Sequence, residues 1–253
     1  MPAARSPDAL SASAHRVSGA CWRVVESQYY VSTLALVDGV TEQRRLEELV
    51  EATKPTVPAE CAGLHYLLST PFRYGPYPTG SRFRRAGATP GVFYASATEQ
   101  TAVAEIAFHR LLFFAESPET PWPANAGQHT AFSVRYGSPR AIDLTRPPLA
   151  RRRKQWMHPT DYAACQTLAH DARAAGIEAI RIASVRDPEH RLNVALLTCR
   201  AFRAKEPAAA RSWGIRLGPT GVQALREFPK ASLEFGRDAF AADPRIAAIG
   251  WER

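Results

Sequence analysis

Residues 71–106 contain four informative strings in close succession: Pro71-Phe72-Arg73-Tyr74, Gly80-Ser81-Arg82-Phe83-Arg84-Arg85, Pro90-Gly91-Val92-Phe93-Tyr94-Ala95-Ser96 and Ala104-Glu105-Ile106. The first two strings place arginines among aromatic residues, and the third places a tyrosine on a short expected strand. The fourth places a single carboxylate in an apolar segment. Arginine offers a planar fork for phosphate, and aromatic rings offer a stacking surface. Together these strings indicate a site for a phosphate-bearing aromatic ligand beside one anionic group.

Two helices are expected around and after this stretch. Ser96-Ala97-Thr98-Glu99 has the form of a capping box and predicts a helix that runs to about Phe114. A second helix is expected over 161–175, with Thr160 as its cap and Gly176 as its stop. Both predictions rest on the agreement of a start signal with an apolar segment.

Strands dominate the rest of the chain after residue 60. Runs rich in β-branched and aromatic residues predict them at 64–68, 92–95, 130–136, 141–144, 180–185 and 193–202, with weaker signals at 213–217 and 231–235. Few of these runs are separated by helices of crossover length, so a doubly wound parallel sheet fits poorly. The sequence therefore predicts an α+β fold with a mixed, largely antiparallel β core and packed helices.

The N-terminal part reads differently. Residues 19–60 are expected to be helical, and one helix is expected to start at Thr41 as its N-cap, with Leu46, Leu49 and Val50 at helical spacing. We therefore expect residues 1–60 to form a tail and a helical extension. Residues 61–253 would form the main domain, with its core at about 64–205.

Composition and charge narrow the classes of function. The chain has 253 residues, of which 45% are hydrophobic, enough to bury a substantial core, and its net charge of +8 favours anionic partners. The sharpest basic run, 151–154, follows two prolines and is expected in a loop, either as a solvated surface or as a patch for an acidic partner or nucleic acid. No apolar run is long enough for a membrane span, and no secretory signal is visible.

The four cysteines are far apart in the sequence and show no metal-binding spacing. They are Cys21, Cys61, Cys165 and Cys199. We expect reduced thiols in a cytoplasmic protein, and no metal.

Glu105 is the key carboxylate, because it is the only charged residue between Glu99 and Arg110 in a segment that is apolar nearly all round. Such a helix should be buried, and a buried carboxylate must be paired, hydrogen-bonded or functional. A salt bridge to one of the nearby arginines is the plain structural alternative.

The other candidate residues also have plain structural interpretations. Tyr94 could be a core aromatic residue, two of the four clustered arginines could be surface residues, and Ser184 could be a satisfied core hydroxyl. His190 is the only histidine near Ser184, and no Gly-x-Ser-x-Gly elbow surrounds that serine, so a serine hydrolase is not expected. Neither a Walker loop nor a dinucleotide-binding turn is visible.

At these residues the sequence resembles the RES-domain family, named for its characteristic Arg, Glu and Ser. The strings that carry the resemblance keep the family's order and spacing between about residues 64 and 200. They are Thr70-Pro71-Phe72-Arg73-Tyr74, Ser81-Arg82-Phe83-Arg84, Gly91-Val92-Phe93-Tyr94-Ala95, Thr101-Ala102-Val103-Ala104-Glu105, Ile182-Ala183-Ser184-Val185-Arg186-Asp187 and Asn193-Val194-Ala195. Trp22-Arg23-Val24-Val25-Glu26-Ser27-Gln28 resembles the longer branch of the family.

The resemblance implies a fold related to bacterial ADP-ribosyltransferase toxins and a role as the toxin of a toxin–antitoxin pair that consumes NAD. ADP-ribose would pass to a protein such as phosphoribosyl pyrophosphate synthetase, or to phosphate or water, and growth would arrest. The partner implied is a small antitoxin that blocks the active site. Position by position, Glu105, Tyr94 and Arg82 would be catalytic, and Arg73, Arg84 and Ser184 would bind NAD.

The chemistry of NAD agrees with this set of residues. Nicotinamide leaves NAD as a neutral ring, so its release needs no general acid, whereas many glycosidases need a second carboxylate to protonate their leaving oxygen. One fixed carboxylate can stabilise the oxocarbenium-like ribose. A single well-placed Glu is therefore enough.

Two other functions remain open from the sequence. A basic nucleic-acid-binding module without catalysis would use the positive charge and the 151–154 run, although no known nucleic-acid-binding signature is visible. The third possibility is a catalytically silent binding domain that keeps the fold.

Overall fold

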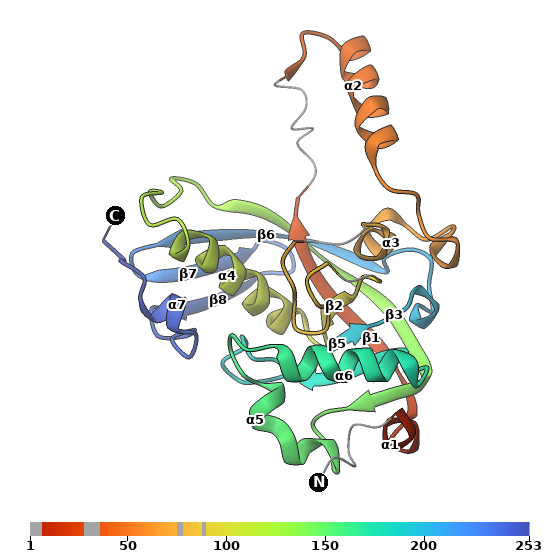
Figure 1. Ribbon diagram of the computed structural model, residues 1–253. Coiled ribbons are helices and arrows are strands. Elements are labelled where there is room, and N and C mark those ends of the chain that lie inside the picture. Colours follow the sequence, from red (N-terminus) through yellow and green to blue (C-terminus); the bar gives the residue numbers. More distant parts are fainter. Residues whose placement is uncertain (1–6, 28–35, 75–77, 88–89, 253) are drawn as a thin grey trace.

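The computed structural model describes residues 7–27, 36–74, 78–87 and 90–252 (Figure 1). An eight-stranded sheet runs through it in the order β1-β2-β5-β4-β3-β6-β7-β8, and an additional pairing joins β1 to β3. The strands are β1 (His15–Glu26), β2 (Phe93–Ser96), β3 (Gly127–Asp143), β4 (Ala179–Ala183), β5 (Leu192–Leu196), β6 (Ala209–Gly218), β7 (Gly221–Arg226) and β8 (Ala231–Gly236). All pairs are antiparallel except β3–β4, which confirms the mixed, largely antiparallel α+β fold.

The long strand β3 holds the sheet together. It pairs with β1 over most of its length, with β6 from Gly127 to Ser133, and with β4 from Ala141 to Asp143. Because β1 also meets β2 at Trp22 and Ser96, the order β1-β2-β5-β4-β3 closes on itself. β6, β7 and β8 extend the sheet as a meander on the far side of β3.

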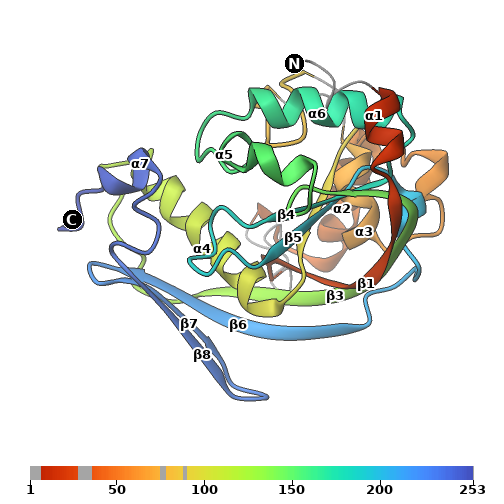
Figure 2. The ribbon, with the colours of Figure 1, turned by 90° about the horizontal axis from the view of Figure 1, so that it is seen from below.

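Seven helices lie in the described part of the chain, and α2, α4 and α6 are the longest. The seven are α1 (Pro7–Ala12), α2 (Val40–Thr53), α3 (Tyr66–Arg73), α4 (Glu99–Ala115), α5 (Arg153–Trp156), α6 (Ala163–Ala174) and α7 (Pro244–Ala247), with 3-10 turns at Ala59–Cys61, Leu149–Arg152 and Cys199–Ala201. Seen from below, α5 and α6 lie on the opposite side of the molecule from β6, β7 and β8, and α4 lies between α7 and the sheet (Figure 2).

Three clusters of buried side chains form the core. α4 packs with β6, β7, β8 and the C-terminal residues Phe240, Ile246 and Ile249. α3 packs on the face of the sheet that carries Phe93 and Leu196. α6 packs on the other face of the sheet, which carries Ile180 and Ile182. The two faces of β4 and β5 therefore belong to different clusters.

The N-terminal prediction is correct in its second half and wrong in its first. α2 is helical, although its N-cap is Gly39 with no side-chain hydrogen bond, and Thr41 does not cap it. Residues 15–26 are not helical: they form β1, which pairs along β3. The aromatic and β-branched residues at Trp22, Val24 and Val25 suit a strand better than a helix. The expected helical residues 28–35 lie outside the described part, and the boundary at residue 60 stays a prediction.

Other predicted elements differ in detail. The strand expected at 64–68 is wrong, because His65 caps helix α3 by accepting a hydrogen bond from the Leu67 N–H. β7 was not predicted, and the two strands expected at 130–136 and 141–144 are one continuous strand. The basic run lies in a 3-10 turn and α5 rather than in a loop.

The expectation of four reduced thiols is wrong for one pair. Cys61 and Cys199 form a disulfide with their Cα atoms 5.5 Å apart, while Cys21 and Cys165 are free and buried. Sequence separation of 138 residues concealed this contact, because it depends on how the 3-10 turns that carry the two cysteines meet. Among the described helices, none is long and apolar enough to cross a membrane.

Candidate functional site

The carboxylate of Glu105 is held by two neutral donors. Ser184 Oγ donates to Glu105 Oε1 at 2.6 Å, and Asn193 Nδ2 donates to the same oxygen at 2.5 Å. Within the described residues, Glu105 forms no ion pair with arginine or lysine and no hydrogen bond to Oε2. The described part of the chain therefore does not contain the salt bridge between Glu105 and an arginine that the sequence left open. Both donors are neutral, and the described residues leave Oε2 without a hydrogen bond.

Strand register brings these residues to one face of the sheet. Asn193 lies opposite both Ser96 and Ile182, and Ala195 lies opposite Tyr94. Side chains two residues apart on a strand point to the same face. Tyr94, Ser96 and Asn193 therefore share the face toward which α4 presents Glu105. Ser96 Oγ donates to Asn193 Oδ1 at 2.7 Å, which turns the Asn193 amide toward Glu105.

Ser184 is completely buried in a tight turn after β4. Its Oγ accepts hydrogen bonds from the N–H groups of Arg186 at 3.2 Å and Asp187 at 2.8 Å, so its own proton is directed to Glu105. His190 closes the turn with a positive φ of 52°, and its Nδ1 lies 2.8 Å from the Ser184 carbonyl oxygen. The turn thus fixes Ser184 as a donor to Glu105 rather than as a nucleophile.

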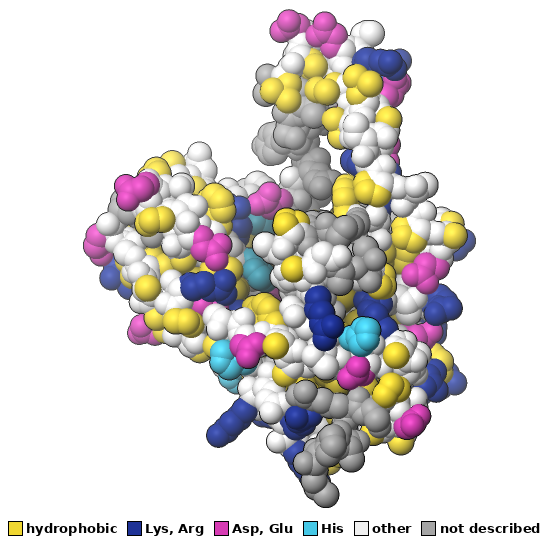
Figure 3. Space-filling view, in the orientation of Figure 1, with side chains coloured by type: hydrophobic (Ala, Val, Ile, Leu, Met, Phe, Trp, Pro, Cys, Tyr) yellow, Lys and Arg dark blue, Asp and Glu magenta, His cyan; other side chains and the backbone are white. Residues whose placement is uncertain are grey.

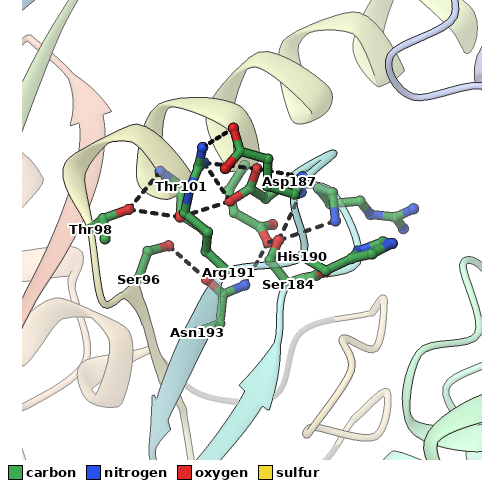
Figure 4. A network of polar contacts seen from close by, with 11 residues as sticks. Ser96, Thr98, Thr101, Ser184, Asp187, His190, Arg191 and Asn193 are labelled. Atoms are coloured by element: carbon green, nitrogen blue, oxygen red, sulfur yellow. Dashed lines mark hydrogen bonds and ion pairs between the residues drawn. The ribbon is translucent and has the colours of Figure 1, made fainter.

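The same turn is tied to the start of α4 (Figure 4). Thr101 Oγ1 donates to Asp187 Oδ2 at 2.8 Å, and Arg191 pairs with the Asp187 carboxylate. Thr98 caps α4 by accepting from the Thr101 N–H. The predicted helix is therefore confirmed, but the predicted capping box is wrong, because Thr98 and not Ser96 is the N-cap. The Glu99 carboxylate instead contacts Arg211, Trp213 and Arg226.

Tyr94 fixes the loop that carries the arginines. Its hydroxyl lies 2.8 Å from Ser81 Oγ and accepts the Phe83 N–H at 2.9 Å. Burial raises the pKa of Tyr94, and the hydrogen bonds and nearby Arg84 and Arg82 only partly oppose this, so the phenol stays neutral. Tyr94 lies on β2, and its hydroxyl bonds to residues 81 and 83. It therefore connects the sheet to the loop of residues 81–85, which we call the arginine loop.

Arg82 is held by backbone carbonyl groups across the site. Its Nη1 donates to the carbonyl oxygens of Trp156 at 2.7 Å and His158 at 3.1 Å, and its guanidinium lies 4.6 Å from the Tyr162 ring centroid. Arg84 follows in a turn in which Ser81 and Arg84 exchange backbone hydrogen bonds. Both arginines therefore lie on the loop that Tyr94 fixes.

Arg73 is engaged elsewhere. Its Nη1 contacts Glu51 at 2.7 Å, and its Nε donates to the Pro55 carbonyl oxygen at 2.5 Å. Of the six residues expected at the site, the contacts join Glu105 with Ser184, and Tyr94 with the Arg82–Arg84 loop. They place Arg73 against α2.

A cavity of about 290 Å³ lies beside the Ser184 turn. Phe108, Asp187, His190, Asp238 and Phe240 are among its lining residues. Arg186 spans this region: its guanidinium lies 3.8 Å from the Phe108 ring centroid and 3.1 Å from the Asp243 carboxylate. Burial opposes ionisation of Asp243, but hydrogen bonds from Arg245 and the charge of Arg186 hold its pKa below the usual range.

Arg186 also reaches the segment before α6. Its Nη2 donates to the Pro159 carbonyl oxygen at 2.6 Å and to the Tyr162 hydroxyl at 3.0 Å. In the space-filling view the surface is hollowed between the part over α4 and α7 and the part over α5 and α6 (Figure 3). Arg186 therefore links the two sides of the candidate site.

Sequence reasoning missed Asn193 as a site residue. The signal was present, because Asn193 is a polar residue at the start of the apolar string Val194-Ala195-Leu196-Leu197. An amide at the edge of a buried strand needs partners, and here they are Ser96 and Glu105. The pairing of β5 with β2 reveals Ser96, and the position of α4 reveals Glu105.

Comparison with known proteins identifies the family of this chain. The RES domain matches residues 57–217, more than half of the chain, and the chain therefore belongs to the RES-domain family. Among solved structures, a chain in the crystal structure of the M. tuberculosis MbcT-MbcA toxin-antitoxin complex is similar, with a TM-score of 0.50 and 10% identity over 81% of this chain and 90% of that chain. A comparison with curated proteins gives no match. At this identity the structural likeness shows the fold alone.

Proposed function

We propose that this chain is the toxin of a toxin–antitoxin pair and that it cleaves the nicotinamide–ribose bond of NAD. Membership of the RES-domain family and the similarity to a chain of a toxin–antitoxin complex support this proposal. The observation that carries it is the Glu105 carboxylate, whose Oε1 is held by Ser184 and Asn193. Neutral donors orient this carboxylate without cancelling its charge.

The proposed reaction breaks one bond and forms another. The electron pair of the C–N bond leaves with nicotinamide, which becomes neutral, and the ribose becomes an oxocarbenium-like cation. Glu105 Oε2 stabilises this cation and orients a ribose hydroxyl. An acceptor then attacks the anomeric carbon and loses a proton. No general acid is needed for the leaving group.

The remaining candidate residues would bind and orient NAD. Arg82 and Arg84 would contact its phosphates from the loop that Tyr94 fixes, and Tyr94 would pack beside the nicotinamide ring. Ser184 would act on the substrate only through Glu105. Arg73 would contact a phosphate only after release from Glu51.

The proposal also names the acceptor of ADP-ribose and the protein partner. ADP-ribose would pass to a protein such as phosphoribosyl pyrophosphate synthetase, or to phosphate or water with depletion of NAD. A small antitoxin would block the site, with a carboxylate-bearing segment near the arginine loop.

The test is nicotinamide release from NAD by purified full-length protein, with and without phosphate. Wild type should release nicotinamide, and Glu105→Gln, which keeps the size but removes the charge, should lower the rate about 100- to 1000-fold, as loss of one group that stabilises transition-state charge does. Glu119→Gln, at an exposed position four residues after the end of α4, is the matched control and should retain full activity.

The outcomes separate the alternatives. Stimulation by phosphate identifies the acceptor, and label transferred from NAD to a protein in lysate identifies a transferase. Equal activity of Glu105→Gln and wild type would refute the mechanism. A folded wild type that binds no NAD, but binds nucleic acid with an affinity that falls steeply with salt, would favour the basic binding module instead.

A further inference from the structure

His109 is a histidine of α4 to which the proposed function assigns no role. It lies one helical turn after Glu105, and residues four apart on a helix have Cβ atoms about 5–6 Å apart. Side chains on a helix lean toward its N-terminus, so the imidazole of His109 lies over the turn that carries Glu105. The imidazole and the Glu105 carboxylate are therefore neighbours on one face of α4.

His109 lines a concave part of the surface. Its side chain is exposed, yet desolvation by the surrounding protein is the largest influence on its pKa. A side chain that is open to solvent and also closely surrounded by protein lies in a hollow. α4 borders such a hollow, which separates the part over α4 and α7 from the part over α5 and α6 (Figure 3). Water can therefore reach the imidazole beside Glu105.

Charged groups from three elements face His109. They are the Glu105 carboxylate on α4, the Arg186 guanidinium in the turn after β4 and the Arg245 guanidinium on α7. Desolvation and the two guanidinium groups lower the pKa of His109, Glu105 raises it, and the net pKa lies below the usual value. In the described part of the chain, no hydrogen bond or ion pair engages the imidazole nitrogens. At neutral pH the ring is therefore uncharged and can accept a proton.

The proposed cleavage of NAD leaves an attacking water molecule without a base. Oε1 of Glu105 accepts hydrogen bonds from Ser184 and Asn193, and Oε2 is assigned to the ribose cation and a ribose hydroxyl. A water molecule that attacks the anomeric carbon must lose a proton, and histidine is the residue most often used for such a transfer. His109 lies one turn from Glu105 and is uncharged, so it can take this proton.

We propose that His109 is the general base of a hydrolytic reaction in which water is the acceptor of ADP-ribose. This inference rests on the proposed cleavage of NAD at Glu105. The water oxygen forms a bond to the anomeric carbon, and the electron pair of the broken C–N bond leaves with neutral nicotinamide. One proton of the water passes to an imidazole nitrogen of His109 and then to solvent. The products are ADP-ribose, nicotinamide and one proton.

The test compares wild type, His109→Gln and Glu105→Gln in phosphate-free buffer, with nicotinamide and ADP-ribose as the products measured. His109→Gln should lower hydrolysis about 100-fold, which lies within the range for loss of one general base. Sodium azide should restore nicotinamide release by His109→Gln and yield ADP-ribosyl azide, because the azide anion attacks without losing a proton. Azide should not restore Glu105→Gln, which lacks the group that stabilises the cation. His170→Gln, at an exposed position on α6, is the matched control and should hydrolyse NAD at the wild-type rate.

The pH profile separates a base from a structural residue. The ratio of wild-type to His109→Gln hydrolysis should be about 100 at neutral pH and above. It should fall as pH decreases through the lowered pKa of His109, because the protonated ring cannot accept a proton.

Three results would overturn the inference. They are full hydrolysis by His109→Gln, a loss that azide does not restore, and a ratio that is the same at every pH. A wild type that uses only phosphate or a protein as acceptor would retain the proposed cleavage but overturn the role of His109. A folded wild type that releases nicotinamide with no acceptor would overturn both.

Discussion

At the scale of single residues, the donors around Glu105 matter because they are uncharged. An arginine at the position of Ser184 or Asn193 would orient the carboxylate equally well but would neutralise the charge that a developing cation needs. Ser184 and Asn193 each donate a hydrogen bond to Oε1. The turn at 184–190 fixes Ser184, and the hydrogen bond from Ser96 fixes Asn193. Oε2 therefore has a fixed position relative to the strand face.

The first prediction concerns Asn193. Asn193→Ala should lower kcat for nicotinamide release about 10- to 100-fold with little change in KM, because one charge-assisted hydrogen bond of about 1.5–3 kcal/mol is lost from Glu105, the group proposed to act in the transition state. Steady-state kinetics with purified protein measure both parameters.

The control for Asn193 is Ser96→Ala. It removes only the hydrogen bond that turns the amide, so its effect on kcat should be clearly smaller. A rise in KM with unchanged kcat in Asn193→Ala would assign Asn193 to substrate binding and contradict the positioning role.

At the scale of secondary-structure elements, α4 connects the parts of the site. Glu99 at its first turn contacts β6 and β7, Thr101 contacts the turn after β4, and Phe108 lies under Arg186. At 3.6 residues per turn, Thr101, Glu105 and Phe108 share one face of this helix, and Glu99 anchors the opposite face. Any displacement of α4 would move Glu105 relative to Asn193.

The second prediction concerns Glu99 and pH. Burial opposes ionisation of Glu99, but hydrogen bonds from Arg226, Trp213 and Arg211 outweigh it and hold its pKa below the usual value. Its contribution to the free energy of unfolding is then complete above the unfolded-state pKa of about 4.3 and is lost as pH falls through the lower folded-state pKa. Glu99→Gln should therefore cost about 3 kcal/mol at pH 7 and much less below pH 4.

Chemical denaturation of wild type and Glu99→Gln across pH 3–8 measures this difference. Glu119→Gln, which is exposed, provides the control and should follow wild type at every pH. A stability difference that does not depend on pH would show that Glu99 contributes by packing alone.

The third prediction concerns the contact between α3 and β2. Gly91 precedes β2, and a Cβ atom at residue 91 would overlap the carbonyl oxygen of Pro71 in α3. Both groups are backbone and cannot move independently, so Gly91→Ala should destabilise the protein by about 3 kcal/mol or more. Thermal melting measures the loss, and Gly250→Ala, where nothing lies within 4 Å, is the control. Equal melting of both variants would refute this close approach.

Sequence predicted the elements whose signals are local. α4 and α6 have clear apolar segments, and Gly176 at φ 68° stops α6 as expected. The predicted cap of α6 is wrong, because its N-cap is Tyr162 and not Thr160. β1 was misread because Trp22, Val24 and Val25 can fit either period over a few residues, and its pairing with β3 lies more than 100 residues away. The family pattern predicts Glu105 and Ser184 as site residues, and the structure joins them by a hydrogen bond, whereas the contacts of Asn193 and Arg73 depend on tertiary structure.

At the scale of the whole molecule, the disulfide between Cys61 and Cys199 joins distant parts of the chain. Cys61 precedes α3, and Cys199 follows β5, so the bond fixes the segment that leads from α2 onto the sheet. Both cysteines are buried, and with Phe72 and Phe202 they belong to the same core cluster. The bond therefore lies between α2 and the central sheet.

The fourth prediction concerns this bond. A cross-link that closes so long a loop stabilises by about 5 kcal/mol in the chain-entropy account, so a reductant should lower the melting temperature of wild type by roughly 10–20 °C. Cys61→Ser should already melt at the lower temperature and should not respond to reductant. Cys21→Ser is the control, since burial raises the pKa of Cys21 to about 12 and keeps it an unreactive thiol. A wild type that melts identically with and without reductant would contain thiols instead.

The link from Arg186 to Asp243 has a consequence for synthesis of the protein. Tyr94, Glu105, Ser184 and Asn193 leave the ribosome in that order, yet Arg186 finds its buried partner only when residue 243 of 253 has been made. At about 5–20 residues per second, the interval between Tyr94 and Asp243 is on the order of ten seconds. During that interval the nascent chain has the candidate site residues but not the contact between Arg186 and Asp243. Copies that end before residue 243 would therefore lack the ion pair that joins the Ser184 turn to the C-terminal segment.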